Sequence, residues 1–483
     1  MTEIRYVDQT LRDGQQSYWG MRMQAGHMLA VADLIDSAGY HAIDIAGSSH
    51  FEVLVRFGRV DPWEGLDAMR AALPGATLRA GMRTNGVVGM AITPDSVIEL
   101  WLATLAKHGI GSVWILDCLH NTVKIKEVAR MARTHGVAPS PQVTFSESPV
   151  HTDDYYAQVV AELAEEPAVE SIILGDETGV LTVERAHTWI PLMKRHAGDV
   201  PLELHFHNTT GLGTVNHLIG VEHGIGILHT AASSLANGPS MPSTEVSVDN
   251  MRRLGHEVSL DTSGLDAVSD HFAGIAVLEG WPTGAPAEFR LAVLQSQFPG
   301  GMMGTLRDQL ARANMAERMP DLLEEAIRVR AEMGYPVMAT PFSQLVGIQA
   351  LMNIVNDERY EVIPDENLMY LAGWYGPPPG PVDPAVLERA WSSERGREIR
   401  DGAAPQPGLE PIRADYDERI SDEEFLLRYL INANDVDAMY AEGKPVTPIV
   451  PGAGSGWVEA LVRETRVGSI SVSLDGVQLE LHR

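Results

Sequence analysis

The sequence has one cysteine and no long hydrophobic run. Cys118 is the only cysteine among 483 residues, so no disulfide can form within the chain, and we expect a reducing compartment. No run of about 20 apolar residues is present, which argues against a transmembrane helix. Residues 1–5 also lack the apolar region of a signal peptide. These observations predict a cytoplasmic protein that does not interact with membranes.

Basic residues are scarce. There are 36 Lys and Arg against 65 Asp and Glu, and the formal net charge is -29. This charge argues against a nucleic acid or an anionic membrane as a partner, and an anionic substrate must therefore meet a local cation. Hydrophobic residues make up 45% and aromatic residues 6% of the chain, which suits a soluble protein with a large core.

What the chain does contain is a regular alternation of short apolar strands and amphipathic helices. Eight such units within about 270 residues predict an α/β fold, a closed (β/α)8 TIM barrel, rather than an open doubly wound sheet. The helical patterns cover Ala25–Ser37, Pro94–His108, Asp153–Glu165, Val183–His196 and Thr244–Leu254. The expected strands are Ile4–Asp8, Ala42–Ala46, Thr77–Met82, Ser112–Asp117, Pro141–Phe145, Ser171–Asp176, Leu202–His207 and Ile227–Ala232.

The pattern becomes mostly helical after about residue 275, which predicts three regions. Residues 1–275 form the catalytic barrel, 276–400 a helical extension, and 412–483 a small C-terminal region beyond the Pro/Gly-rich break at 402–411. Alternation in 469–474 and 477–481 around Asp475-Gly476 predicts a terminal β-hairpin. Such a hairpin is marginal alone, so we expect it to dock onto a sheet or another subunit, and we expect a homo-oligomer.

A His-x-His string at the end of the seventh expected strand is the strongest candidate site. Side chains two apart on a strand point the same way, so His205 and His207 face one spot. Asp13, in Arg12-Asp13-Gly14 after the first strand, brings a carboxylate to the same end of the barrel. Two imidazoles and one carboxylate suit a divalent metal with open coordination positions. The alternative interpretation is a pair of hydrogen-bonded core histidines.

Other polar residues fall near predicted strand ends. Asn237, beyond the eighth strand, is either a fourth metal ligand or a turn residue before glycine. Arg12 and Arg83 either grip a substrate carboxylate or pair with an acid at the barrel mouth. We favour substrate binding for Arg83. Gln16 either hydrogen-bonds a substrate oxygen or holds its loop.

Two acidic residues, Asp44 and Asp176, are expected to point into the barrel. They either anchor Arg12 or a metal-bound water from a second layer around the metal, or act as acid/base groups. We favour the anchoring role.

Several strings, in the same order, resemble the carboxyltransferase domain of pyruvate carboxylase and the related subunits of transcarboxylase and oxaloacetate decarboxylase. The resemblance covers roughly residues 3–385. Its carriers are residues 8–17 (DQTLRDGQQS), 51–57 with Pro62-Trp63, Met82-Arg83-Thr84-Asn85, the His-x-His strand, Pro299-Gly300-Gly301 and Thr340-Pro341-Phe342-Ser343.

The resemblance implies roles for these residues. It assigns Asp13, His205 and His207 to a divalent metal, whether Zn, Mn, Mg or Co. It assigns Arg12, Gln16 and Arg83 to pyruvate. Thr340 matches a threonine that shuttles a proton between biotin and pyruvate. The metal is expected to polarise the oxygens of a 2-oxo acid and to stabilise an enolate.

The sequence departs from this family at two positions. Carboxyltransferases carry a metal-bound carbamylated lysine in a Lys-Asp-Met-Ala-Gly string, whereas residues 175–179 read Gly-Asp-Glu-Thr-Gly. This string is similar to the Gly-Asp-Thr-x-Gly segment of hydroxymethylglutaryl-CoA lyase and isopropylmalate synthase. Gln344 also stands where carboxyltransferases have lysine. We therefore expect no carbamylated lysine at the metal, with Asn237 or water in its place.

The chain also has no Ala-Met-Lys-Met biotinyl motif, so biotin, if used, must arrive on a separate carrier protein. The sequence therefore predicts a metal-dependent carboxyltransferase or decarboxylase acting on a 2-oxo acid. One alternative is a biotin-independent C–C lyase or condensing enzyme with the same metal. The other is a non-catalytic subunit of a carboxylase complex.

Overall fold

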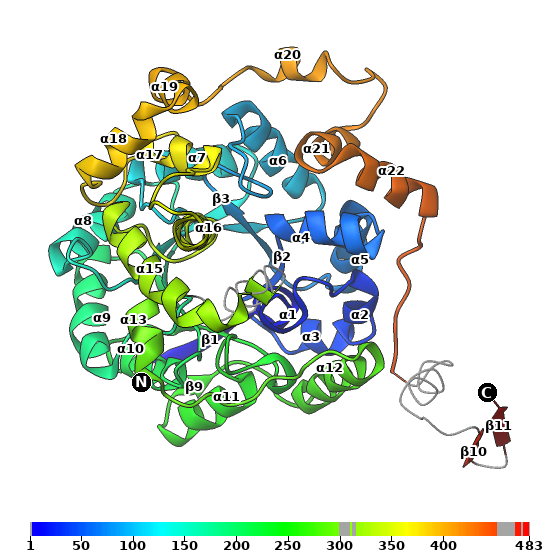
Figure 1. Cartoon of the computed structure of the whole chain (residues 1–483). Coiled ribbons are helices and arrows are strands. Elements are labelled where there is room, and N and C mark those ends of the chain that lie inside the picture. The colour runs from blue at the N-terminus through cyan, green and yellow to red at the C-terminus, as the bar shows by residue number, and fades with distance from the viewer. Residues whose placement is uncertain (1, 299–309, 312–314, 452–468, 475–476, 483) are drawn as a thin grey trace.

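Eight parallel strands close into a barrel in the computed structural model, which describes residues 2–298, 310–311, 315–451, 469–474 and 477–482 (Figure 1). Each strand pairs with the next along the chain, and β1 pairs with both β2 and β8, which closes the barrel. A ninth short strand adds to β1. The strands are β1 (Glu3–Asp8), β2 (Ala42–Gly47), β3 (Leu78–Arg83), β4 (Ser112–Leu116), β5 (Ala138–Thr144), β6 (Ile172–Asp176), β7 (Leu202–Phe206), β8 (Ile227–Thr230) and β9 (Glu257–Val258).

Amphipathic helices surround the barrel and cover the apolar outer faces of its strands. Their buried faces and the strands share one hydrophobic core, in which Trp63, Trp101 and Trp189 are among the largest buried side chains. The helices are α2 (Ala25–Leu29), α3 (Ala32–Ser37), α5 (Pro62–Ala72), α6 (Asp95–Lys107), α7 (Thr122–Thr134), α8 (Asp153–Ala164), α9 (Val183–Ala197), α10 (Gly213–Glu222), α11 (Thr244–Arg253) and α12 (Leu265–Glu279).

The expectation of a single helix over Ala25–Ser37 is wrong, because the structure has two helices there. The chain leaves helical geometry at Val31, where φ is -128° and ψ is 10°, so α2 and α3 are separate. Both segments still pack on the barrel core through Met28 and Ile35.

The segment after the barrel is mostly helical, as the sequence predicts. Helices α15 to α19, together with Leu116, Cys118 and Leu119 from the end of β4, build a second hydrophobic core. Helices α20 to α22 instead pack on the barrel core through Ile412, Phe425 and neighbours. The remaining helices are α1 (Gln15–Trp19), α4 (Ser48–Val53), α13 (Leu291–Ser296), α15 (Met319–Glu332), α16 (Phe342–Val355), α17 (Asp365–Leu371), α18 (Pro384–Ser392), α19 (Glu394–Asp401), α20 (Leu409–Arg413), α21 (Asp422–Leu430) and α22 (Ala433–Glu442).

The C-terminal strands β10 (Ser469–Leu474) and β11 (Val477–His482) pair antiparallel, as expected for a hairpin. They form a sheet separate from the barrel sheet. The expected turn at Asp475-Gly476 and the Pro299-Gly300-Gly301 string lie outside the described residues. None of the helices in the described parts of the chain is long and apolar enough to cross a membrane.

Candidate metal centre

Asp13 is placed at the barrel mouth by an unusual turn after β1. Residues Thr10–Gly14 form a single π-helical turn, all of it buried, between β1 and α1. Such wide turns inside helical segments are frequent at functional sites. This turn points the consecutive side chains of Arg12 and Asp13 into the molecule, where their side chains bond each other (Nη1 to Oδ2, 2.7 Å).

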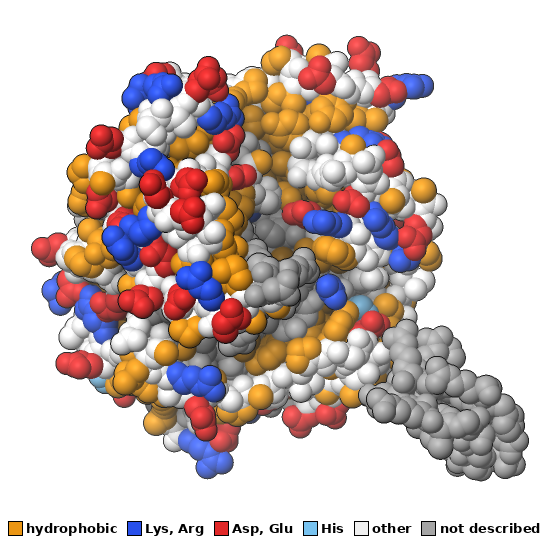
Figure 2. Space-filling view, in the orientation of Figure 1, with side chains coloured by type: hydrophobic (Ala, Val, Ile, Leu, Met, Phe, Trp, Pro, Cys, Tyr) orange, Lys and Arg blue, Asp and Glu red, His pale blue; other side chains and the backbone are white. Residues whose placement is uncertain are grey.

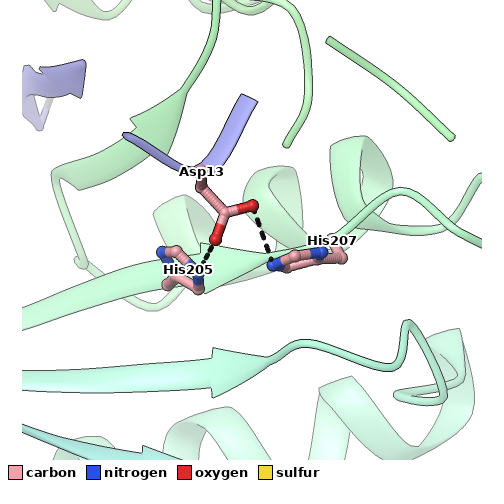
Figure 3. A group of neighbouring side chains, drawn as sticks. All are labelled: Asp13, His205 and His207. Carbon is pink, nitrogen blue, oxygen red and sulfur yellow. Dashed lines mark ion pairs between the residues drawn. The ribbon is translucent and has the colours of Figure 1, made fainter. Parts of the chain in front are cut away.

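His205 and His207 meet Asp13 from β7 and the residue that follows it (Figure 3). His205 Nε2 lies 3.8 Å from Asp13 Oδ2, and His207 Nε2 lies 3.5 Å from Asp13 Oδ1. All three side chains are buried, and one potential ligand atom from each lies within 4.8 Å of the others. The structure thus brings together the three residues that the sequence singled out for a metal.

A backbone contact sets the orientation of His207. Its Nδ1 lies 2.6 Å from the carbonyl oxygen of Pro239, which can only accept, so Nδ1 carries the hydrogen. Nε2 is buried and has no hydrogen-bond partner among the described residues. Burial opposes a charge on His207, but the Asp13 carboxylate, with Glu177 and the Pro239 carbonyl, outweighs it and raises the pKa of the imidazole. Asp13 therefore favours positive charge at this nitrogen.

His205 is oriented by a buried chain of polar residues. Glu203 Oε2 accepts a hydrogen bond from His229 Nε2 at 2.8 Å, so Nδ1 of a neutral His229 is an acceptor. His205 Nδ1 lies 2.9 Å from it and donates, which leaves the Nε2 lone pair facing Asp13. Arg79 completes the chain by two bonds to Glu203, at 2.6 and 3.1 Å.

Arg79, Glu203 and His229 were not among the residues that the sequence pattern indicated. A signal for Glu203 existed, because it precedes His205 by two residues and so shares its side of β7. His229 could not be found in this way, because its contact with His205 depends on the register between β7 and β8.

Arg12 is held by acidic and amide side chains. Besides Asp13, its guanidinium donates to Asp44 Oδ2 at 3.1 Å and to Gln9 Oε1 at 2.7 Å, and it stacks on Trp114 at 4.6 Å from the ring centre. Burial raises the pKa of Asp13, but His207 and Arg12 outweigh it and hold the pKa well below its ordinary value. Arg12 therefore keeps Asp13 ionised.

Asp44 and Asp176 occupy different settings. Asp44 anchors Arg12, which is one of the roles expected for it, and burial raises its pKa to about 6 against the opposing effect of Arg12. Asp176 instead accepts backbone N–H bonds from Val180 at 2.9 Å and Leu181 at 2.8 Å. It therefore shapes the loop that follows β6.

Arg83 ends β3 and lines a small cavity of about 20 Å³. Its Nε donates to the Gly86 oxygen at 3.0 Å and its Nη2 to the Gly89 oxygen at 2.5 Å. Its guanidinium forms no ion pair with an acid among the described residues, and burial lowers its pKa. The other lining residues include Asn85, Asp117, Cys118, Phe342 and Tyr375.

Gln16 and Thr340 are both exposed. Gln16 lies on α1, one turn after Asp13, and its side chain bonds no described residue. Thr340 immediately precedes Pro341, which lines the Arg83 cavity, and its carbonyl oxygen lies 3.6 Å from Cys118 Sγ. Thr340 therefore lies near the end of β4.

Asn237 forms a turn and lies close to the residue after His207. Its backbone is left-handed, with φ of 68°, and its Oδ1 accepts a bond from Asn208 Nδ2 at 2.8 Å. Both features fit the turn role. The amide oxygen keeps a second lone pair, so metal binding by Asn237 stays a prediction.

Gly175, which stands where carboxyltransferases have lysine, lies on β6 in register with His205. A Cβ atom at this position would lie 2.5 Å from Gln142 Nε2 and 2.8 Å from Glu177 Oε1. Gln142 and Glu177 therefore fill the space that a side chain at 175 would need.

The donor set fits a divalent cation. It offers one ionised carboxylate and the Nε2 atoms of two imidazoles, which can bind an ion once they carry no proton, because each Nδ1 has its own partner. These are borderline nitrogen and hard oxygen ligands, which suit Zn²⁺, Mn²⁺ or Co²⁺.

Comparisons with known proteins agree with this architecture. The family described as HMGL-like matches residues 102–271, and that described as a conserved carboxylase domain matches residues 293–444. The fold is that of the carboxyl transferase domain from Rhizobium etli pyruvate carboxylase, solved with pyruvate. That domain is 22% identical, with a TM-score of 0.83 over 92% of this chain and 77% of that one.

Three curated relatives cover most of the chain. A pyruvate carboxylase subunit from Methanocaldococcus jannaschii is 30% identical over 89% of this chain and 76% of its own length. The 2-oxoglutarate carboxylase large subunit of Hydrogenobacter thermophilus is 29% identical over 92% of this chain and 64% of its own length. The methylmalonyl-CoA carboxyltransferase 5S subunit of Propionibacterium freudenreichii subsp. shermanii is 28% identical over 80% and 76%. By these relatives and by its barrel, the chain belongs to the carboxyltransferase enzyme family that includes the Methanocaldococcus jannaschii pyruvate carboxylase subunit.

Proposed function

We propose that the chain transfers a carboxyl group to or from a 2-oxo acid, with a divalent cation bound by Asp13, His205 and His207. The observation that carries the proposal is that both Nε2 atoms face an ionised carboxylate while both Nδ1 atoms are engaged elsewhere. Pyruvate and 2-oxoglutarate, which appear in the relatives' names, support the substrate class.

The chain's own side chains would hold the substrate around this centre. A bound cation supplies Lewis-acid polarisation of the substrate oxygens. Arg83 is the candidate for the substrate carboxylate, since a guanidinium without an acidic partner beside a cavity favours an anion. Gln16 would donate to a substrate oxygen, and Arg12 would act chiefly by keeping Asp13 ionised and in place.

The carboxyl donor or acceptor would be biotin on a separate carrier protein. In the direction of carboxylation, the C–N bond of carboxybiotin breaks and a C–C bond forms at the carbon next to the keto group. That carbon loses one proton, and the biotin nitrogen gains one. Thr340, exposed near the Arg83 cavity, is the candidate for relaying this proton through its hydroxyl.

A biotin-independent C–C lyase or condensing enzyme is the second candidate. The observations that favour it are the HMGL-like match over residues 102–271 and glycine at position 175. It would use the same centre of Asp13, His205 and His207, and Arg83 would again hold the substrate carboxylate.

One assay distinguishes the two candidates. Purified protein loaded with Mn²⁺, Zn²⁺, Mg²⁺ or Co²⁺ is incubated with 2-oxo and 3-hydroxy acids, with and without biotin or a biotinylated carrier. The carboxyltransferase proposal predicts metal-dependent decarboxylation of an oxaloacetate-like acid that biotin accelerates. Cleavage of a 3-hydroxy acid that is indifferent to biotin would establish the lyase instead. No turnover with any metal would contradict both.

A further inference from the structure

Glu177 carries a buried carboxylate oxygen without a partner beside the metal centre. It lies in the loop after β6, and its Oε1 accepts a hydrogen bond from Thr144 Oγ1 at 3.2 Å. Its Oε2 is buried and bonds to no described residue. A buried acceptor without a donor is costly, and a charged one more so. This oxygen therefore favours a cation or a donor close to it.

The lack of a side chain at Gly175 gives Glu177 its position. Gly175 and His205 are paired in register on neighbouring parallel strands, so their Cα atoms face the same side of the sheet. Glu177 Oε1 lies 2.8 Å from where a Cβ of residue 175 would be. The carboxylate therefore folds back over Gly175, on the side of the barrel where His205 and its partners lie.

Electrostatics also connect Glu177 with the metal centre. Burial raises the pKa of Glu177 to about 7, and His207 acts in the opposite direction, as a nearby positive charge does. Asp13 is the only acid in the three-residue group, so a divalent ion there would keep an excess positive charge that the unpartnered Glu177 Oε2 could balance.

We infer that Glu177 supplies a second carboxylate to the cation bound by Asp13, His205 and His207. This inference rests on the metal site proposed above. Glu177 does not belong to the group whose ligand atoms lie within 4.8 Å of one another. Its side chain must therefore turn from Thr144 toward His207 when the ion binds. Glutamate has three side-chain torsions, and rotation about them moves the carboxylate.

Binding of Mn²⁺, followed by the loss of the free-ion signal in electron paramagnetic resonance, tests the inference. Glu177→Gln keeps the shape and removes the charge, and we expect its Kd for Mn²⁺ to rise at least about tenfold. Asp117→Asn is the matched control, since it also removes a buried carboxylate near the barrel mouth, where Asp117 is bound by Thr84 and Leu119. We expect its Kd to stay within about threefold of the wild-type value, near the scatter expected for an unrelated site.

Urea unfolding of the metal-free proteins checks that both variants are folded. A Kd of Glu177→Gln equal to that of Asp117→Asn would overturn the role of Glu177 while leaving the metal site intact. A wild-type protein that binds no Mn²⁺, Zn²⁺ or Co²⁺ would overturn the metal site itself, and this inference with it.

Discussion

Two arginines near the barrel mouth hold their guanidinium groups in opposite settings. Arg12 contacts two carboxylates, those of Asp13 and Asp44, whereas Arg83 contacts only backbone oxygens among the described residues. A partly buried cation without a counter-ion lowers the cost of bringing an anion beside it. In a chain of net charge -29, Arg83 is therefore the better candidate for holding a substrate carboxylate.

Arg83→Lys tests this role. Lysine keeps the charge but lacks the planar fork that binds a carboxylate through two parallel hydrogen bonds. We expect kcat/KM for the 2-oxo acid to fall at least about tenfold, which corresponds to ~1.4 kcal/mol. Arg253→Lys, on the exposed face of α11, is the control and should leave the kinetics unchanged. Unchanged kinetics in Arg83→Lys would make the residue structural.

Two strands, β3 and β7, carry polar residues at alternate positions, and this alternation places the polar side chains inside the barrel. On β7, Glu203, His205 and the following His207 alternate with apolar residues, and on β3, Arg79 and Arg83 do so with Gly81 between them. Alternation along a strand places all of these in the barrel. The Arg79–Glu203 pair lies deep and the candidate metal ligands His205 and His207 lie nearer the mouth, so the ion pair supports them from below.

Breaking that ion pair should weaken the barrel. Arg79→Met removes the cation and leaves Glu203 buried, with only His229 and the Ser171 hydroxyl as partners among the described residues. We expect the free energy of unfolding to fall by about 3–5 kcal/mol near neutral pH, as for other buried pairs that lose one partner. Urea unfolding of the metal-free protein measures it. A loss below about 1 kcal/mol, as for an exposed pair, would contradict the buried pairing.

The pH dependence of this loss has a definite sign. Burial raises the pKa of Glu203, but Arg79 and His229 outweigh it and hold the pKa well below 4.5, its ordinary value. A depressed acid pKa stabilises the fold above the pKa of the unfolded chain, and this contribution is lost as pH falls through the folded pKa. The difference in the free energy of unfolding between the wild type and Arg79→Met should therefore become smaller as the pH falls below about 4.5. If the difference in unfolding free energy stayed constant down to the pH of acid unfolding, ionised Glu203 would not be the group that Arg79 stabilises.

The strands were predictable to within a few residues because alternation and apolar runs are local. The largest difference is at β5, which was expected from Pro141 and begins at Ala138. Proline lacks a donor, but Pro139 and Pro141 share one side of the strand, toward β6. On the other side, the Ala138 N–H donates to the Gly111 carbonyl, so β5 pairs with β4 from Ala138 onward. The prolines lie on the side of β6, and β5 pairs with β6 only from Gln142 onward.

The convergence of Asp13, His205 and His207 was predictable because their strings are short and lie at strand ends. The positions of Glu177 and His229 were not predictable, and the reason differs between the two residues. Glu177 lies in the loop after β6, whose path the sequence does not fix, and the contact of His229 with His205 depends on the register between β7 and β8. The turn at Thr10–Gly14 that directs Asp13 inward was likewise invisible in a pattern of apolar residues.

At the scale of the whole molecule, two hydrophobic cores meet at the end of β4. One contains the barrel and α20 to α22, and the other contains α15 to α19. The face shown in Figure 2 is hollowed near its centre, and acidic and basic side chains are spread around it. The three expected regions and the homo-oligomer stay predictions.

Metal binding should stabilise the barrel by mass action. An ion that binds the folded chain alone adds about 2.7 kcal/mol when its free concentration is a hundredfold above its Kd. We expect the Tm of the barrel to rise with Mn²⁺ or Zn²⁺ and to fall after chelation, as followed by calorimetry. The rise should be absent in Asp13→Asn, which keeps the shape but loses the charge. An equal rise in that variant would place the ion elsewhere.

The most direct test is the metal content of the wild type and His207→Ala, measured side by side by elemental analysis after equal loading. We expect about one divalent ion per wild-type chain, since three ligand atoms converge on one point. His207→Ala should lose most of the ion and the carboxyl-transfer activity while its circular dichroism stays that of the folded barrel. Full metal occupancy in the folded variant would contradict a centre built from Asp13, His205 and His207.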